Sequence, residues 1–163
     1  MLDKVIASAN LIQNSYSKAS VLTAIAQAIG KLNQPEKAAI LLDKAIASAN
    51  LIQDSNFKAN VLSAIAQAIG KLNQPEKAAV LLDKAIASAN LIQDSSNKHR
   101  ALRAIAEAAA NLKNWGQALQ LAQQCPSDDC KVESLAKVLT VHAEQQHPEL
   151  KEEEEMSNEE AEE

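Results

Sequence analysis

Aromatic residues are nearly absent from this sequence. Phe, Trp and Tyr make up only 2% of its 163 residues, although hydrophobic residues reach 47%. A core must therefore be built from Ala, Leu, Ile and Val, and such small side chains let helices approach to about 8 Å, the short end of the usual packing distances. Glycine is also scarce, with three copies, so there is no glycine-rich loop of the kind that binds phosphate groups.

Long apolar runs are missing as well. No stretch approaches the roughly 18 apolar residues that a membrane span requires. The segment MLDKVIASAN at the N-terminus places charges at Asp3 and Lys4 and lacks the apolar region of a signal peptide. We therefore expect a cytoplasmic protein that has no membrane partner.

Basic residues do not cluster as they do in nucleic-acid-binding proteins. Residues 1–150 carry 15 Lys or Arg and 13 Asp or Glu, whereas residues 151–163 carry one Lys and eight Glu. This last segment has no apolar face that could offset the entropy lost on ordering it. We expect no nucleic-acid partner, and we predict that residues 148–163 form an acidic, disordered tail.

The dominant feature of the sequence is a tandem repeat. Segments 3–42 and 43–82 match at 33 of 40 positions, and QAIGKLNQPEKAA occurs in both without change. A third copy begins identically at Asp83 and diverges after Ser95, and a weaker half-copy follows at 134–144. Such a period is typical of solenoids, in which each unit buries its apolar faces against its neighbours.

Each repeat contains two predicted helices joined by a short turn. Apolar residues of the first helix recur at three- and four-residue spacing, which indicates one buried helical face. Asn33 tolerates a left-handed backbone conformation, and Pro35 has its φ angle preset for a first helical position. Asp54 is a candidate N-cap for the next repeat.

The second helix of each repeat carries two apolar stripes. One stripe contains Ala38, Leu42 and Ala45, and the other contains Ile40 and Leu51. We expect a helix that is apolar on two sides to be covered on two sides, as stacked hairpins would do. The sequence therefore predicts an all-α protein, an α-solenoid of about three to four stacked helix-turn-helix repeats.

The apolar positions resemble the signature of the tetratricopeptide repeat family. The residues that carry this resemblance in the first repeat are Leu22, Ile25, Ala26, Ile29, Ala38, Leu42, Ala45 and Ile46, and the second repeat has the same spacing. The segment NWGQAL at 114–119 resembles the turn and second-helix opening of that family. The period here, from Asp3 to Asp43, is longer than the family's period of about 34 residues, which indicates an extended variant. The predicted solenoid spans residues 1–147, with repeats at about 19–58, 59–98 and 99–130 and a terminal capping helix at about 131–146.

The resemblance implies that the first helices line a concave groove that binds peptides. The candidate partner-binding residues lie on the first helices away from the apolar stripe: Ser20, Thr23, Gln27, Asn60, Ser63, Gln67, Arg100, Arg103 and Glu107. Their hydroxyl and amide groups suit an extended peptide backbone, and guanidinium groups suit carboxylates. An ordinary solvated helix face would have the same composition.

No group of residues has the spacing of a catalytic or cofactor site. Cys125 and Cys130 are interpreted as a buried small residue and a turn residue, as a reversible disulfide, or as zinc ligands together with His142 and His147. None of the three histidines lies beside a Ser, Cys or Asp at a spacing that suggests a catalytic triad. We expect no enzyme activity, no cofactor and no metal.

The sequence thus predicts a non-enzymatic protein–protein interaction module or scaffold that binds a peptide or protein partner on its concave face. One alternative is a structural protein that forms homo-oligomers through an open N-terminal helix, because Met1–Asp3 aligns with the interior of a second helix. Another is the sensor fragment of a larger signalling protein. The acidic tail is interpreted either as a solubilising terminus or as a segment that folds back on the basic residues of the groove.

Overall fold

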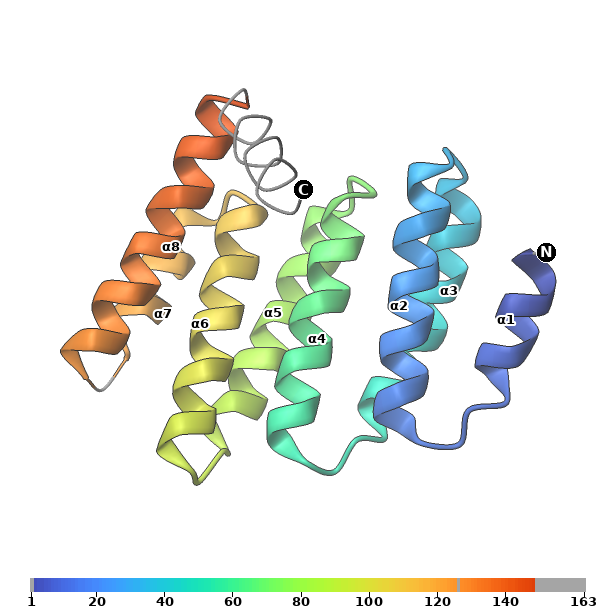
Figure 1. Ribbon diagram of the computed structural model, residues 1–163, viewed down its shortest axis with the longest axis horizontal. Helices are drawn as coiled ribbons and strands as arrows, with labels where there is room; N and C mark the ends of the chain where they lie inside the picture. The colour runs from blue at the N-terminus through green and yellow to red at the C-terminus, as the bar shows by residue number, and fades with distance from the viewer. Residues whose placement is uncertain (1, 126, 149–163) are drawn as a thin grey trace, which may run out of the picture.

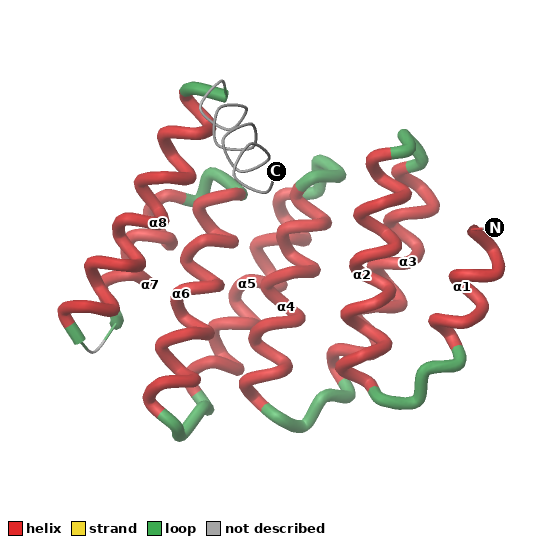
Figure 2. Tube along the Cα trace, in the orientation of Figure 1, coloured by secondary structure: helices red, strands yellow, loops and turns green. Residues whose placement is uncertain are grey.

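The computed structural model describes residues 2–125 and 127–148, and this part of the chain is helical throughout, without a strand. Its helices are α1 (Leu2–Asn10), α2 (Ser15–Lys31), α3 (Pro35–Asn50), α4 (Ser55–Gly70), α5 (Pro75–Asn90), α6 (Ser95–Asn111), α7 (Trp115–Gln123) and α8 (Asp128–Gln146) (Figures 1 and 2). Consecutive helices pack against each other. The predicted all-α solenoid is confirmed.

The helices form two layers. The first helices α2, α4, α6 and α8 run side by side, and each contacts the next (Figure 1). The second helices α3, α5 and α7 contact first helices, but over the described ranges no Cα atom of one second helix comes within 8 Å of another. The first-helix layer is therefore the more closely spaced of the two, which places it on the inner side of the solenoid's curve.

One apolar stripe of the second helices is not covered, contrary to expectation. Ile40 and Leu51 of the first hairpin are 58% and 66% exposed, and the equivalent Val80 and Leu91 are 55% and 67% exposed. The cause is the spacing of the outer layer, because neighbouring second helices stand too far apart to cover this stripe. The second helices bury only the side that faces the first helices.

The turn inside each hairpin follows the predicted chemistry. Asn33 and Asn73 adopt φ angles of 57° and 56°, in the left-handed region that Asn enters more readily than most residues. Pro35 and Pro75 are the first residues of α3 and α5, where the missing N–H leaves no helical hydrogen bond unmade. In the third hairpin Lys113 takes the left-handed position, with a φ angle of 60°.

The joint between successive first helices is built from a leucine and a glycine. Leu72 and Leu112, which follow α4 and α6, each lie beside a glycine near the end of the preceding first helix. A Cβ atom added at Gly30 would lie 3.6 Å from Leu72 Cδ2, whereas one added at Gly70 would lie 1.8 Å from Leu112 Cδ2. The second joint is therefore closed more tightly than the first.

The corners between units are held by side chains from the following helix. Asp54 is the N-cap of α4, as predicted, and accepts hydrogen bonds from the backbone N–H groups of Asn56 and Phe57 at 2.9 and 3.0 Å. In α2, α4 and α6 a lysine in the first turn donates to the last carbonyl of the preceding helix. These bonds are Lys18 to Asn10 at 2.8 Å, Lys58 to Asn50 at 3.2 Å and Lys98 to Asn90 at 3.4 Å. A cation suits the end of a helix, where carbonyl groups lack partners.

The last corner has the same four-residue length as the others but is held differently. It comes earlier along the chain because α7 has nine residues, whereas α3 and α5 have sixteen. The first helices α2, α4 and α6 begin at Ser15, Ser55 and Ser95, ahead of the repeat starts predicted at 19, 59 and 99. The same period would start α8 at 135, but this helix begins already at Asp128, which is also ahead of the predicted capping helix at 131. At this corner a disulfide between Cys125 and Cys130 takes the place of the lysine contact. Residues 149–163, which make up nearly all of the predicted acidic tail, lie outside the described residues.

Candidate partner-binding surface

The structure brings four of the predicted site residues together between α2 and α4. Ser20, Thr23 and Gln27 of α2 and Asn60 of α4 line one hollow of about 230 Å³, together with Tyr16, Ala24, Val61 and Ala64. These residues come from helices that occupy the same place in successive repeats, so equivalent turns of two repeats face each other across the hollow. The sequence prediction thus placed part of the set on one continuous surface.

Thr23 and Ser63, however, do not offer their hydroxyl groups to a partner. Both side chains are only 4% exposed. Thr23 donates a hydrogen bond to the backbone carbonyl of Ala19 at 2.7 Å, and Ser63 donates to that of Asn60 at 2.9 Å. The predicted ladder of hydroxyl and amide groups is therefore reduced to Ser20, Asn60 and the glutamines.

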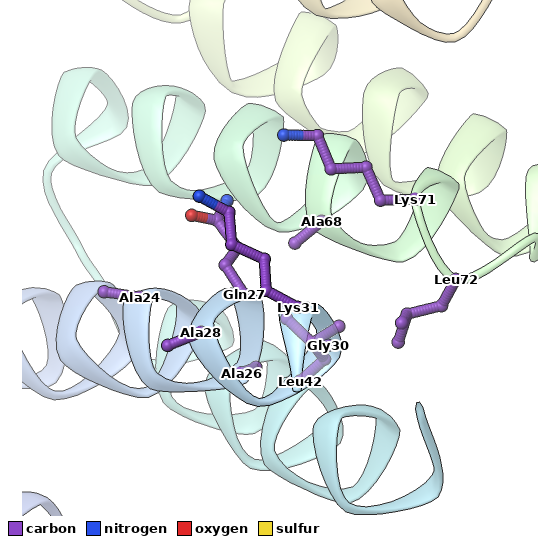
Figure 3. A pocket seen from close by; sticks show the side chains of 10 residues that line it. All are labelled: Ala24, Ala26, Gln27, Ala28, Gly30, Lys31, Leu42, Ala68, Lys71 and Leu72. Carbon is purple, nitrogen blue, oxygen red and sulfur yellow. The ribbon is translucent and has the colours of Figure 1, made fainter. Parts of the chain in front are cut away.

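A second hollow extends the first toward the C-terminal ends of the helices. It measures about 440 Å³ and is lined by the later turns of α2, by Ala68, Lys71 and Leu72, and by Leu42 at its base. Figure 3 shows the Gln27 and Lys31 side chains extending from α2 toward α4. Ala24 and Gln27 line both hollows, so the two form one groove along the α2–α4 boundary, which we call the α2–α4 groove.

An aromatic pair lies at the other end of this groove, where Tyr16 lines the first hollow. Tyr16 and Phe57 have ring centroids 4.7 Å apart and planes inclined by 42°, a geometry typical of favourable aromatic pairs. Tyr16 is 38% exposed and Phe57 is 45% exposed. The groove therefore has an apolar end at the aromatic pair and a basic end at the lysines.

The electrostatic character of the groove comes from its lysines. Over their full described lengths, α2 and α4 contain no Asp or Glu. Lys18 and Lys58 are used in the corners, where they bind carbonyl groups. Lys31 and Lys71 line the groove and make no side-chain hydrogen bond or ion pair with the part of the chain that the structure describes. Their charges are thus available to an anionic ligand.

The predicted residues on α6 lie elsewhere. Arg103 forms an ion pair with Glu133, and Glu107 forms one with Lys137 at 3.5 Å, so both hold α8 against α6. Arg100 and Arg103 line a separate hollow of about 290 Å³ with His99 and Cys130. Gln67 lines a further hollow of about 540 Å³ between α4 and α6, together with Lys71 and Lys113.

The sequence analysis did not identify several residues that line the groove. Ala24 and Ala64 were not considered because an exposed alanine carries no chemistry, yet small side chains at this position keep the groove open. A detectable signal was present, since the equivalent residue of the third repeat, Ala104, is also alanine. Tyr16 was missed because it is not repeated, and its contact with Phe57 depends on the packing of two units.

The cysteine interpretation is partly corrected. Cys125 is buried at 1% exposure, as expected for a small core residue, and its Sγ lies 3.3 Å from Ser134 Oγ. It is also bonded to Cys130, so neither sulfur is a free thiolate ligand for zinc. Among residues 2–125 and 127–148, no group of three or more His, Cys, Asp or Glu is arranged to hold a metal ion. None of the helices described is long and apolar enough to cross a membrane.

Comparison with known proteins supports the fold alone. No family model matches the sequence, and no curated protein matches it. The crystal structure of Ton1535 from Thermococcus onnurineus NA1 is similar in fold, with a TM-score of 0.67. The two sequences are 22% identical, and the match covers 85% of this chain and 42% of Ton1535. The chain therefore spans less than half of the length of that protein.

Proposed function

We propose that this protein is a non-enzymatic binding module whose α2–α4 groove takes an extended peptide segment of a protein partner. The observation that carries this proposal is the continuity of the groove, which runs from the Tyr16–Phe57 pair to Lys31 and Lys71 across two adjoining hollows. An elongated, shallow site of this kind suits a peptide chain better than a compact small molecule, because most of a small ligand's surface is buried in its pocket.

The chemistry of the groove favours a partner with acidic side chains. Ser20, Gln27 and Asn60 offer hydroxyl and amide groups that can hydrogen-bond a peptide backbone. Lys31 and Lys71 supply positive charge without competing carboxylates on α2 or α4. An apolar side chain of the peptide would pack beside the aromatic pair, and an acidic side chain would lie at the lysine end.

The groove can be tested by filling it. Ala24→Arg combined with Ala64→Arg places two long side chains in the groove, and both alanines are exposed, so the fold should tolerate the change. The probe is a set of peptides that are selected from a displayed random library for binding to the wild-type protein. We expect the double variant to bind these peptides about tenfold more weakly or worse, a loss of roughly 1.4 kcal/mol. Fluorescence anisotropy measures the affinity.

A matched control comes from the outer layer of the same repeats. Ala47→Arg combined with Ala87→Arg changes two alanines that are also exposed, on α3 and α5. This variant should bind the selected peptides as the wild type does. The proposal is wrong if Ala24→Arg with Ala64→Arg binds the peptides as tightly as the wild type does. It is also wrong if Ala47→Arg with Ala87→Arg is the variant that loses binding.

One observation favours self-association as a second candidate function. Leu32 is 64% exposed, although the equivalent Leu72 and Leu112 pack beside Gly30 and Gly70. Val21 of α2 is likewise 37% exposed, although the equivalent Val61 is 4% exposed. The side of α2 that faces away from α4 therefore presents the same apolar residues that join one unit to the next, and a second copy of the chain offers an identical surface for a two-fold contact.

The cellular compartment stays a prediction. The cytoplasmic location expected from the sequence conflicts with the Cys125–Cys130 disulfide, since disulfides persist mainly in oxidising compartments. In a reducing cytoplasm the pair would be two thiols, and the last corner would lack its covalent link. The proposed peptide groove lies between α2 and α4, at a distance from this corner along the array, and does not depend on it.

A further inference from the structure

The inner layer carries a row of lysines along one edge. Lys31, Lys71 and Lys113 lie at or just beyond the C-terminal ends of α2, α4 and α6, and they line the two hollows between these helices. All three are exposed, and none has a side-chain partner in the described part of the chain. Glu36 and Glu76 lie at the same edge but belong to the second helices behind. We call these three lysines the lysine row.

The chain itself contains a segment of opposite charge that starts at this edge. Residues 149–163 include nine Glu and one Lys. They follow α8, which belongs to the first-helix layer and runs in the same direction as α2, α4 and α6 (Figure 1). The described chain therefore ends at the edge where the lysine row lies.

The length of this segment is sufficient to reach every lysine of the row. Residues 149–163 span at most about 50 Å when fully extended, at roughly 3.3–3.6 Å per residue. Neighbouring packed helices lie about 8–10 Å apart, so the distance from α8 across α6 and α4 to α2 is roughly 30 Å. The segment is therefore long enough to contact even Lys31, the most distant of the three lysines.

We infer that residues 149–163 dock in cis on the lysine row and compete there with the acidic partner peptide. Each exposed contact between Glu and Lys is weak in water, but the covalent link gives the segment an effective concentration in the millimolar range. Added salt should therefore weaken the docking, because charges on an exposed edge are screened over about 8 Å at physiological ionic strength. The competition rests on the proposed function, whereas the docking does not.

The docking can be tested by zero-length carbodiimide cross-linking of the full chain, followed by mass spectrometry of tryptic peptides. We expect cross-links from Glu152–Glu155 to Lys31, Lys71 or Lys113. The peptides that contain Lys31 and Lys71 differ in sequence at residues 20/60 and 23/63, so the two sites can be told apart. Mixing unlabelled and 15N-labelled protein separates contacts within one chain from contacts between chains.

Controls are available in the same molecule. Lys44 and Lys84 are exposed on the second helices α3 and α5 and should form few cross-links to the segment. Replacement of Glu152, Glu153, Glu154 and Glu155 by Gln, or a several-fold increase in salt concentration, should reduce the yield at the lysine row several-fold. Equal yields at Lys44 and Lys84, or cross-links only between chains, would falsify the docking.

Affinity for the selected peptides separates this inference from the proposed function. If the segment competes, the Glu-to-Gln variant binds the peptides more tightly. The ratio of the two Kd values equals the factor by which docking lowers the fraction of wild-type molecules whose site is free. Unchanged affinity in that variant overturns the competition. If lysine-row cross-links are absent while Ala24→Arg with Ala64→Arg still abolishes peptide binding, the docking is wrong and the proposed function stands.

Discussion

Lys113 occupies a backbone conformation that its side chain does not favour. Its φ angle is 60°, and the equivalent residues of the first two hairpins are Asn33 and Asn73. The left-handed region crowds the Cβ atom of ordinary residues, whereas a short Asn side chain can hydrogen-bond locally and visits it routinely. The third hairpin therefore keeps the turn geometry after losing the residue that suits it.

This difference predicts that Lys113→Asn stabilises the protein. We expect the free energy of unfolding to rise by up to about 1 kcal/mol, measured as an increase in the urea midpoint at unchanged slope. The control is Lys44→Asn in the middle of α3, where Asn is a poorer helix former than Lys and should lower stability by a few tenths of a kcal/mol. A decrease in both variants would contradict the strain assigned to Lys113.

Residue type predicts local conformation better than it predicts exposure. Asn33, Pro35 and Asp54 act on their own backbone, and the structure confirms the turn and cap expected from them. Thr23 and Ser63 were expected to face a ligand because they are polar. A hydroxyl group can instead satisfy itself on a carbonyl of its own helix, so it can be buried at little cost. The sequence alone does not distinguish these two cases.

At the scale of helices, the leucine–glycine joint decides how closely neighbouring units pack. Gly30 and Gly70 occur in identical sequence contexts, but their surroundings differ. A Cβ atom at Gly70 would lie 1.8 Å from Leu112 Cδ2 and 3.3 Å from Leu112 Cγ. A Cβ atom at Gly30 would lie 3.6 Å from Leu72 Cδ2, which is an ordinary contact distance. The first joint is therefore the looser of the two at this contact, although the hollow of about 540 Å³ borders the second joint.

The two glycines therefore predict opposite outcomes for one substitution. Gly30→Ala should raise the free energy of unfolding by about 0.5–1 kcal/mol, because Gly is that much less favourable than Ala in a helix. Gly70→Ala should lack this gain or destabilise, because displacing a packed side chain costs about 1–3 kcal/mol. Urea unfolding measures both.

The Leu112 contact is isolated by a double-mutant cycle between Gly70→Ala and Leu112→Ala. If Leu112 is the obstacle, Gly70→Ala should become favourable in the Leu112→Ala background. Equal stabilisation by Gly30→Ala and Gly70→Ala in the otherwise unchanged chain would show that the two joints do not differ.

Helix periodicity predicted the elements, but not how far apart the outer helices stand. Spacing of apolar residues and the Pro-initiated turns indicated both helices of each repeat, and the structure confirms them. The exposed Ile40 and Leu51 stripe was wrongly expected to be covered. Its exposure depends on the angle between successive hairpins, which is set by contacts of the inner layer and leaves no pattern in the second helix. The extent of the groove depends on the same angle.

At the scale of the whole molecule, the environment of a residue depends on its place in the array. Val21 and Val61 occupy the same position in two nearly identical repeats, but they are 37% and 4% exposed because only Val61 has a preceding first helix to pack against. Ile25 is half-buried, whereas the equivalent Ile65 is fully buried. The side of α2 that faces away from α4 thus exposes residues whose equivalents in the next repeat are part of the core.

If this surface pairs with a second copy, association must weaken when it is charged. Sedimentation velocity over a wide concentration range should show a dimer at high concentration for the wild type. Val21→Lys with Leu32→Lys should remain monomeric, whereas Leu91→Lys, which changes an equally exposed leucine on the outer layer, should not differ from the wild type. A wild-type chain that stays monomeric throughout would remove self-association as a function.

The leucine–glycine joint also has a consequence for how such an array changes in evolution. Each joint uses only residues that the repeat itself carries, a glycine near the end of one first helix and a leucine after the next. A gene that gained one more copy of the repeat by unequal recombination would encode a unit that already fits on both sides. Copy number can therefore change in whole units without any compensating substitution, and near-identity between neighbouring repeats is the record that such an event leaves.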